Sequence, residues 1–308
     1  MKRVLTAALA ATTLLLAGAC GDAAEPATTA PTSAGAAAYP VTVGDLTLDS
    51  KPEKIVSLSS TATEVLFAIG AGPQVTAVDD QSTYPADAPR TDLSGYKPNA
   101  EAIAAKDPDL VILANDIDKI VSQLDQLKIP VFLAPATADL DGTYQQIGQL
   151  GTLTGHKTEA DALNTRMAAD IDKIVKDVPA RATPLSYYYE LDPTFYSVTS
   201  KTFIGSIFAK FGMTNVADAA DPDGAKGGYP QLSQEALVKS DPDMIFLADS
   251  KCCKQTPQTV AARTGWSTIT AVKSNQIHAL DDDIASRWGP RTVDLVRAIA
   301  DAVAKVPA

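Results

Sequence analysis

The chain has 308 residues, of which 45% are hydrophobic, 20% charged and 6% aromatic, with three cysteines, two histidines and a formal net charge of −11. This length exceeds what one compact core usually covers, so two domains or one two-lobed unit are expected. The acidic balance excludes a protein that coats nucleic-acid phosphates, and the scarcity of histidine excludes a histidine-rich metal site or a multi-histidine catalytic centre.

Residues 1–19 have the pattern of an export signal. Lys2 and Arg3 precede an uncharged run over 4–16, and small residues lead into Cys20. This pattern is typical of a cleaved signal peptide rather than of a membrane-spanning helix. The small residues before Cys20 resemble the lipobox of bacterial lipoproteins, which implies lipidation of that cysteine, although the residue three before it is Ala here and most often Leu in the motif. The alternative is an ordinary signal with an incidental cysteine.

The segment after Cys20 predicts a disordered tether. Residues 21–38 contain only Ala, Thr, Pro, Ser, Gly and two acids. Such a segment cannot bury a core, and random-coil scaling gives it a reach of roughly 20 to 25 Å. We therefore expect residues 20–40 to anchor a folded body at the outer face of the cytoplasmic membrane.

From Pro40 onward, short β-branched runs alternate with helical stretches. The first series predicts strands at 54–58, 75–78, 110–113 and 131–133 and helices over 61–69, 100–106 and 117–127. The residues Thr61-Ala62-Thr63-Glu64 are expected to form a capping box that opens the first helix. Strand–helix alternation of this kind implies right-handed crossovers and a mostly parallel sheet that helices cover on both faces.

A long helix separates this series from a second one. Apolar residues recur at helical spacing over 156–178, and Pro179 ends the run. A helix of this length spans about 35 Å, so it can brace two lobes; the alternative is a long surface helix of one domain. The second series predicts strands at 184–191, 244–247 and 277–280 and helices over 203–211 and 292–306. The predicted fold class is α/β, with two Rossmann-like three-layer lobes, 41–155 and 180–308, joined by a rigid helix over 156–179.

An internal repeat relates the two lobes. Residues 101–114 align without gaps with residues 235–248. Each segment has a glutamate in the first turn of a short helix, then an Asp-Pro-Asp break and a hydrophobic strand. The helix macrodipole alone favours an acid at either position by a few tenths of a kcal/mol. The repetition nevertheless predicts that Glu101 and Glu235 present one negative charge on each lobe to a partner protein with basic pockets.

The repeat, the start at 54–72, the Tyr84-Pro85 step, the run 228–235 and Gly289-Pro-Arg291 together resemble one family. It is the substrate-binding proteins of iron-siderophore and cobalamin ABC importers, whose fold class is the class III substrate-binding protein. The resemblance covers about residues 40–306 and implies limited hinge closure over a ligand held between the lobes. It also implies a monomer without catalytic activity that delivers its ligand to an ABC permease and its ATPase subunits, with Glu101 and Glu235 docking on permease arginines.

Ligand contacts are expected where strands end, because ligands of open α/β sheets bind at the carboxyl ends of the strands. The candidates are Tyr84, Tyr96, Tyr188, Tyr229, Asp283, Arg287 and Trp288. Aromatic side chains suit a bulky, partly polar chelate, and an arginine can give bidentate hydrogen bonds to oxygen anions. The resemblance itself implies contacts at Tyr96, Tyr229, Asp283 and Arg287. The alternatives are that strand alternation turns some tyrosines of 187–189 into the core, and that Arg287 merely pairs with Asp283.

The remaining candidates concern metal and redox chemistry. His156 and His278 are expected to be structural, so the metal should arrive already chelated and no resident cofactor or metal site is expected. Cys252 and Cys253 are adjacent, with Cα atoms about 3.8 Å apart, shorter than an ordinary disulfide prefers. A strained vicinal disulfide and two free thiols are both open.

Three function classes remain in competition. The first is a binding protein that delivers an iron(III)-siderophore or cobalamin-type chelate to an importer. An extracellular hydrolase on the same fold is the second, although the sequence has no Gly-x-Ser-x-Gly elbow and neither histidine has the context of a triad. A heme-binding or envelope-adhesion lipoprotein is the third, with histidine available for axial ligation.

Overall fold

The computed structural model describes residues 38–307. The predicted signal peptide, the lipidation site Cys20 and nearly all of the predicted tether lie outside this range. Within it, no helix is both long enough and apolar enough to cross a membrane.

The N-terminal lobe is preceded by an antiparallel hairpin that the sequence analysis did not predict. The hairpin consists of β1 (Val41–Val43) and β2 (Leu46–Leu48). The lobe then contains β3 (Ile55–Leu58), α1 (Ser60–Ala68), β4 (Val75–Val78), α2 (Ala100–Ala104), β5 (Leu110–Leu113), α3 (Ile120–Gln126), β6 (Val131–Leu133) and α4 (Leu140–Thr154). Short 3-10 helices at Gly72–Gln74 and Ile117–Lys119 complete it.

The C-terminal lobe follows the long helix α5 (Lys157–Asp177). Its elements are β7 (Ser186–Glu190), α6 (Phe203–Ala209), β8 (Thr214–Asn215), α7 (Gln234–Ser240), β9 (Met244–Leu247), α8 (Pro257–Ala261), α9 (Thr270–Lys273), β10 (Ile277–Ala279), α10 (Asp282–Ala285) and α11 (Thr292–Val303). Two further 3-10 helices lie at Val216–Ala220 and Trp266–Thr268.

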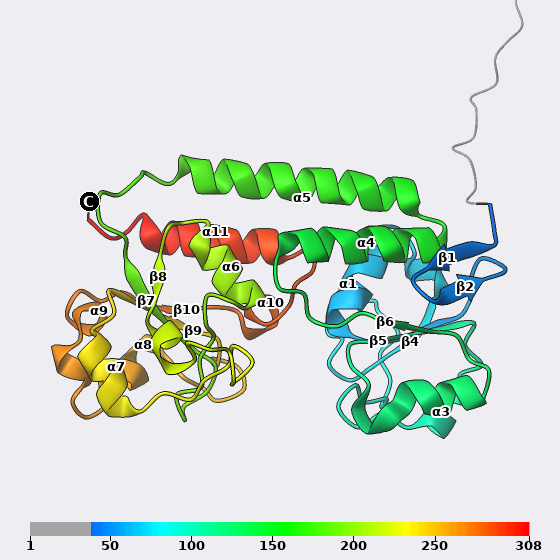
Figure 1. The fold of residues 1–308 in the computed structure, drawn as a ribbon, viewed down its shortest axis with the longest axis horizontal. Helices are drawn as coiled ribbons and strands as arrows, with labels where there is room; N and C mark the ends of the chain where they lie inside the picture. Colours follow the sequence, from blue (N-terminus) through cyan, green and yellow to red (C-terminus); the bar gives the residue numbers. More distant parts are fainter. Residues whose placement is uncertain (1–37, 308) are drawn as a thin grey trace, which may run out of the picture. The chain divides into compact units, whose positions relative to one another are not determined.

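Both lobes contain a four-stranded parallel sheet with the same strand order. The sheets run β4-β3-β5-β6 and β10-β9-β7-β8, so in each lobe the first and third strands of the series pair at the centre. The repeated segments form α2 with β5 and α7 with β9, which are equivalent positions in the two sheets. The predicted α/β class with two related lobes is confirmed (Figure 1).

The strands are buried because helices cover both faces of each sheet. In the N-terminal lobe, one core lies between the sheet and α1 and α4, and another lies between the sheet and α2 and α3. In the C-terminal lobe, α6 and α11 cover one face, and α7, α8 and α9 cover the other. The residues of β5 and β9 are accordingly all buried and apolar, as expected for central parallel strands.

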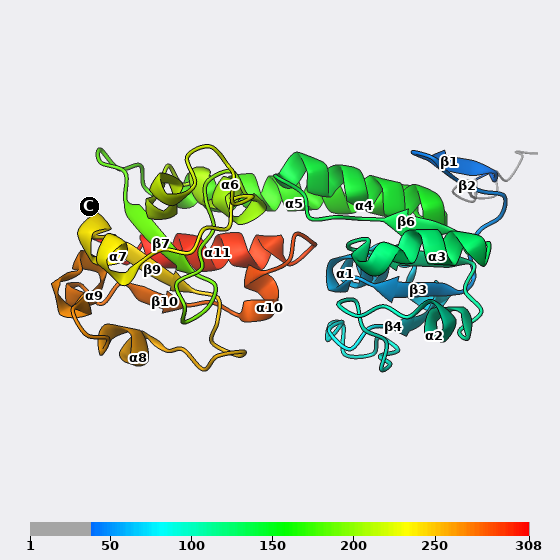
Figure 2. The ribbon, with the colours of Figure 1, turned by 60° about the horizontal axis from the view of Figure 1, so that its bottom comes forward.

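Helix α5 contributes to the cores of both lobes through one face. Its residues Leu163 and Met167 belong to a core of the N-terminal lobe, and Ile171 belongs to a core of the C-terminal lobe. Figures 1 and 2 show α5 lying along α4 and then along α11, and both pairs are in contact. The expected bridging helix is thus present, with α4 as an unpredicted neighbour.

The start of α1 differs from the expectation. The helix begins at Ser60, and the hydroxyl of Ser59 caps it by accepting a hydrogen bond from the Ala62 amide at 3.2 Å. The predicted capping box is therefore wrong. Glu64 lies inside the helix rather than at its third position, so its carboxylate is available for other contacts.

The close approach of α4 and α5 generates a stability prediction. A Cβ added at Gly151 of α4 would overlap Ala160 of α5 and lie 3.0 Å from the carbonyl oxygen of His156, whereas a Cβ at Gly148 would meet nothing within 4 Å. We expect Gly151→Ala to lower the free energy of unfolding by about 1–3 kcal/mol through overpacking.

Gly148→Ala is the matched control, because it should raise the free energy of unfolding by about 0.5–1 kcal/mol through helix propensity alone. Urea unfolding followed by circular dichroism measures both. Equal stabilisation by the two substitutions would contradict the close packing of α4 against α5.

Candidate functional site

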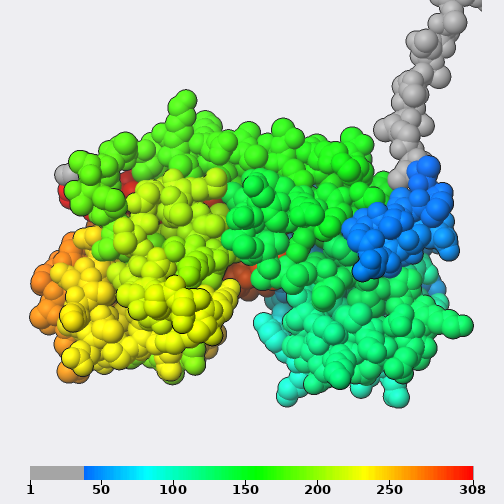
Figure 3. Space-filling model, in the orientation of Figure 1, coloured from blue at the N-terminus to red at the C-terminus, as the bar shows by residue number. Residues whose placement is uncertain are grey.

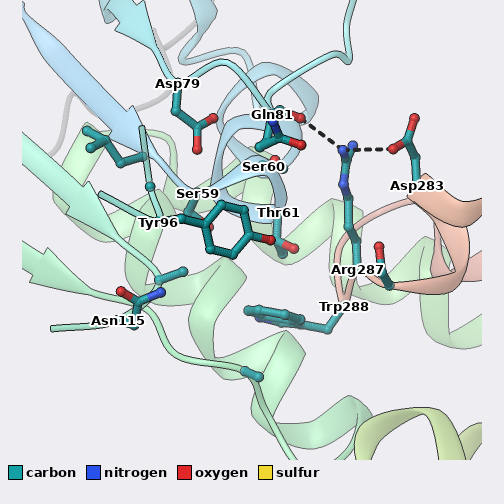
Figure 4. A pocket seen from close by; sticks show the side chains of 15 residues that line it. Ser59, Ser60, Thr61, Asp79, Gln81, Tyr96, Asn115, Asp283, Arg287 and Trp288 are labelled. Carbon is teal, nitrogen blue, oxygen red and sulfur yellow. Dashed lines mark hydrogen bonds and ion pairs between the residues drawn. The ribbon is translucent and has the colours of Figure 1, made fainter. Parts of the chain in front are cut away.

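A cavity of about 440 Å³ lies where the strands of the N-terminal lobe end. Its walls come from residues that follow the strands and from the segment around α10: Leu58, Ser59, Ser60, Thr61, Asp79, Gln81, Gly95, Tyr96, Ala114, Asn115, Ala136, Asp283, Ser286, Arg287 and Trp288. The sheet order reverses between β3 and β5, and such a switch point is where open α/β sheets bind ligands. Figure 3 shows the surface hollowed between the two lobes, and Figure 4 shows the cavity itself.

Tyr96 presents its ring to this cavity. The side chain is 70% exposed, and Figure 4 shows it projecting between the strand-end residues and Trp288. Its position depends on Gly95, because a Cβ there would lie 2.8 Å from a carboxylate oxygen of Asp79 and 3.0 Å from the carbonyl oxygen of Leu58. The glycine thus lets the loop before α2 pack closely on the ends of β3 and β4.

Asp79 is a nearly buried acid in the cavity wall. The hydroxyl of Ser82 donates to it at 2.6 Å, and Ser82 in turn lies 3.1 Å from the hydroxyl of Thr63. Burial raises the pKa of Asp79 above its ordinary value, although the Ser82 hydrogen bond opposes this. The cavity wall therefore contains a buried carboxyl group whose position the hydroxyl of Ser82 fixes.

Arg287 enters the same cavity from the C-terminal lobe with its guanidinium already paired. One amino group donates to Glu64 at 2.7 Å. The other donates to the Gln81 carbonyl oxygen at 3.0 Å and to Asp283 at 3.2 Å, as Figure 4 shows. Next to it, the indole N–H of Trp288 donates to Gln146 of α4 at 3.1 Å. This segment therefore joins the two lobes as well as lining the cavity.

The structure brings together four of the seven predicted ligand contacts. Tyr96, Asp283, Arg287 and Trp288 line one cavity, as far as the described residues define it. The half-exposed Tyr84 lies under the guanidinium of Arg291, 4.5 Å from its ring centre, and Tyr229 is half exposed on the C-terminal lobe. Neither of these two lines the cavity, so their contact with a ligand stays a prediction.

The interpretation of Tyr188 as a ligand contact is wrong. Its side chain is fully buried and packs edge-on against Trp266, with ring centres 6.3 Å apart. Tyr187 and Tyr189 are buried on the opposite face of the sheet, where Tyr187 stacks on Phe208. The central position of β7 explains this, because helices cover both faces of a central parallel strand and alternation then exposes neither set of side chains.

Sequence reasoning missed Glu64, which is only 2% exposed. Its carboxylate accepts hydrogen bonds from Arg287 and from Arg291, the latter through Nε at 2.9 Å and Nη2 at 2.6 Å. Arg291 directly precedes α11, and its side chain pairs with Glu64 of the other lobe. Arg287 and Arg291 follow Glu64 by 223 and 227 positions, and no local sequence pattern can indicate contacts between residues so far apart.

The remaining candidates lie away from the cavity. Glu101 and Glu235 are both exposed in the first turns of α2 and α7. His156 lies 3.1 Å from Gln74 and His278 lies 3.0 Å from Gln276, so both have structural partners. Residues 38–307 contain no group of three or more His, Cys, Asp or Glu that could hold a metal ion.

Cys252 and Cys253 are joined to each other as a vicinal disulfide, with Cα atoms 3.8 Å apart. Their loop, which follows β9, is bound to α10. The carboxylate of Asp282 accepts hydrogen bonds from the amides of Ser250, Lys251 and Cys252 at 2.8 to 3.1 Å. The disulfide loop is therefore connected to the short helix that precedes Arg287.

Comparison with known proteins agrees with this geometry. Residues 55–284 match the family model described as periplasmic binding protein. The chain belongs to the periplasmic binding protein family. An uncharacterized ABC transporter substrate-binding lipoprotein of Bacillus subtilis (YvrC) is 30% identical to this chain, and the match covers 86% of both. A cobalamin-binding protein of Halobacterium salinarum is 31% identical, over 87% of this chain and 75% of that one.

Solved structures place this periplasmic binding protein in the same fold. A possible iron-binding (periplasmic solute-binding) protein from Staphylococcus epidermidis is similar with a TM-score of 0.71 and 25% identity, over 83% of this chain and 100% of that one. The vitamin B12 binding protein BtuF of Vibrio cholerae is similar with a TM-score of 0.67 and 24% identity, over 82% and 96%. The class III fold expected from the sequence is confirmed.

The C-terminal lobe of this periplasmic binding protein has a buried polar cluster at its own strand ends. Glu190, which ends β7, forms a bidentate ion pair with Arg263 at 2.6 Å for both contacts. Asp249, which follows β9, is fully buried, and neither of its carboxylate oxygens has a hydrogen-bond partner within the described range. Burial, reinforced by the Glu190 carboxylate, raises the pKa of Asp249 to about 7.

This cluster predicts a pH-dependent stability. Because the folded pKa of Asp249 is raised above its ordinary 3.8, its stabilising contribution is complete below about pH 4 and is lost as pH rises to about 7. Asp249→Asn resembles the protonated acid, so it should raise the free energy of unfolding by about 1–2 kcal/mol at pH 8. This gain should shrink toward pH 4.5.

Urea unfolding at both pH values measures the effect. The control Asp301→Asn replaces an exposed carboxylate of α11 and should show no such pH-dependent gain. A gain for Asp249→Asn that is equal at both pH values would refute the buried, protonated acid.

Proposed function

We propose that this extracytoplasmic binding protein captures a cobalamin-type corrinoid in the cavity beside Tyr96 and delivers it to the permease of an ABC importer. The choice of ligand rests on one observation, which is that the guanidinium of Arg287 already has hydrogen-bond partners within the protein. Among the described residues that line the cavity, Arg287 is the sole cation, and Glu64, Asp283 and a carbonyl oxygen already accept its hydrogen bonds.

The charge balance of the cavity disfavours an anionic chelate. Asp79 and Asp283 line it together with acceptor groups of Ser59, Ser60 and Asn115. A ferric catecholate carries several negative charges, which would be desolvated beside carboxylates with no free cation to compensate them. A corrinoid bears primary amides around its macrocycle, and these can donate to the acceptors in the wall. The 31% identity to a protein named cobalamin-binding supports the same choice over other neutral chelates.

The shape of the site suits a ligand held at one edge. A cavity of about 440 Å³ is smaller than a whole corrinoid, so we expect one edge of the macrocycle to enter it and the rest to occupy the hollow between the lobes (Figure 3). Tyr96 and Trp288 supply flat apolar surfaces at the mouth, and such surfaces stack well on a planar conjugated ring.

Delivery requires contact with the membrane machinery. Glu101 and Glu235 occupy equivalent exposed positions in the two lobes, and we propose that they dock on basic sites of the permease. We further propose that lipidated Cys20 holds the protein at the outer face of the cytoplasmic membrane. The 30% identical relative from Bacillus subtilis is named a lipoprotein, which supports this anchor.

Ligand titration tests the proposed cargo. We expect cyanocobalamin to give saturable binding by calorimetry with a dissociation constant of about 1 µM or lower, and ferric enterobactin to give none. Tyr96→Ala should raise that constant about tenfold or more, because it removes a stacking surface. The control Leu127→Ala removes an exposed side chain at the end of α3 and should leave the dissociation constant unchanged. Saturation by ferric siderophores or hemin without binding of cyanocobalamin would refute the corrinoid proposal.

Charge reversal tests the docking sites. The double variant Glu101→Lys/Glu235→Lys should abolish cellular uptake of the ligand while its affinity in solution stays unchanged. The control Asp170→Lys/Asp301→Lys reverses two exposed charges on α5 and α11 and should leave uptake intact. Loss of ligand binding in the first variant would assign these glutamates to folding or to the cavity instead.

A further inference from the structure

The carboxylate of Glu64 connects the two lobes through hydrogen bonds. It belongs to α1 of the N-terminal lobe, and its oxygens accept three hydrogen bonds from the segment between α10 and α11 of the C-terminal lobe, at 2.6 to 2.9 Å. The carboxylate is 1% exposed, and the side chains of Arg287 and Arg291 are only 10% and 18% exposed. The ion cluster is therefore largely shielded from water and from screening by salt.

Neighbouring contacts place the same segment firmly on the N-terminal lobe. A Cβ added at Gly289 would lie 3.4 Å from the methyl group of Thr61 and 3.9 Å from Glu64. Trp288 donates to Gln146 of α4, and Val293 packs against cores of both lobes. The segment 287–293 thus acts as one continuous contact between the lobes.

We propose that Glu64 is the positioning residue that locks the two lobes together at the cavity and sets the direction of Arg287, so that the ligand site is formed before the ligand arrives. The inference rests on the proposed function for its effect on affinity. Since Arg287 also holds Asp283 and the Gln81 carbonyl, moving it would displace both sides of the cavity at once. Preformed sites bind tightly because ligand binding spends no free energy on ordering them.

A matched buried pair provides the control. Glu190 is fully buried and pairs with Arg263 in bidentate fashion, and both residues lie within the C-terminal lobe. Glu64→Gln and Glu190→Gln each remove the charge of a buried carboxylate at nearly constant volume, so both should lower the melting temperature. Glu64→Gln alone should affect the contact between the lobes.

Trp288 gives a readout that needs no ligand. The chain has two tryptophans, and Trp266 is fully buried in the C-terminal lobe, so a Trp266→Phe background leaves Trp288 as the reporter. In that background, Glu64→Gln should shift the emission of Trp288 to longer wavelength as water reaches the indole. Glu64→Asp keeps the charge and should recover most of the wild-type emission.

Ligand kinetics complete the test. We expect Glu64→Gln to raise the dissociation constant for cyanocobalamin about tenfold to a hundredfold, mainly through faster dissociation, with Glu190→Gln unchanged. The double variant Glu64→Gln/Arg291→Gln should raise the dissociation constant little more than either single variant does, because the two residues act as one unit. A Glu64→Gln protein that is less stable but has wild-type Trp288 emission would overturn the lock. If cyanocobalamin does not bind the wild type, the proposed function fails, and the emission of the ligand-free protein still decides the role of Glu64.

Discussion

The carboxylate of Glu64 is buried in one lobe and neutralised by two arginines of the other. An unpaired buried charge is strongly unfavourable, so the lobes cannot part at this point without hydrating three charged groups. Helix α5 joins the lobes a second time, because one of its faces packs into a core of each. The two connections, one ionic and one apolar, explain how two separate sheets can present a single cavity.

Much of the fold could be predicted from local pattern. The runs at the central strands β3, β5 and β9 were found because such strands are buried and largely apolar, whereas the edge strand β4 was found from its β-branched residues although Thr76 is exposed. Helix α4 was missed, because three glycines and three threonines lower its intrinsic propensity. Packing of its apolar face on the sheet and on α5 stabilises it, and such tertiary contacts leave no mark in a local window.

The site was predictable only in part, for a related reason. Rules about strand ends depend on topology, and they led to Tyr96 and Arg287, both of which line the cavity. They could not separate Tyr188 from the exposed tyrosines, because exposure depends on what covers a strand. Nor could they pair Glu64 with Arg291, because the two sequence positions become neighbours only when both lobes have folded.

The two lobes have the same strand order but carry different kinds of residue at the ends of their central strands. Leu58 and Asn115 border the open cavity in one lobe, whereas the corresponding residues of the other, Glu190 and Asp249, fill the same place with a buried ionic cluster. The C-terminal lobe therefore contributes to the cavity through the segment 283–288 rather than through the ends of its strands. A ligand in this cavity would therefore contact strand ends in one lobe and the segment around α10 in the other, so the two lobes would contribute to its binding through different structural elements.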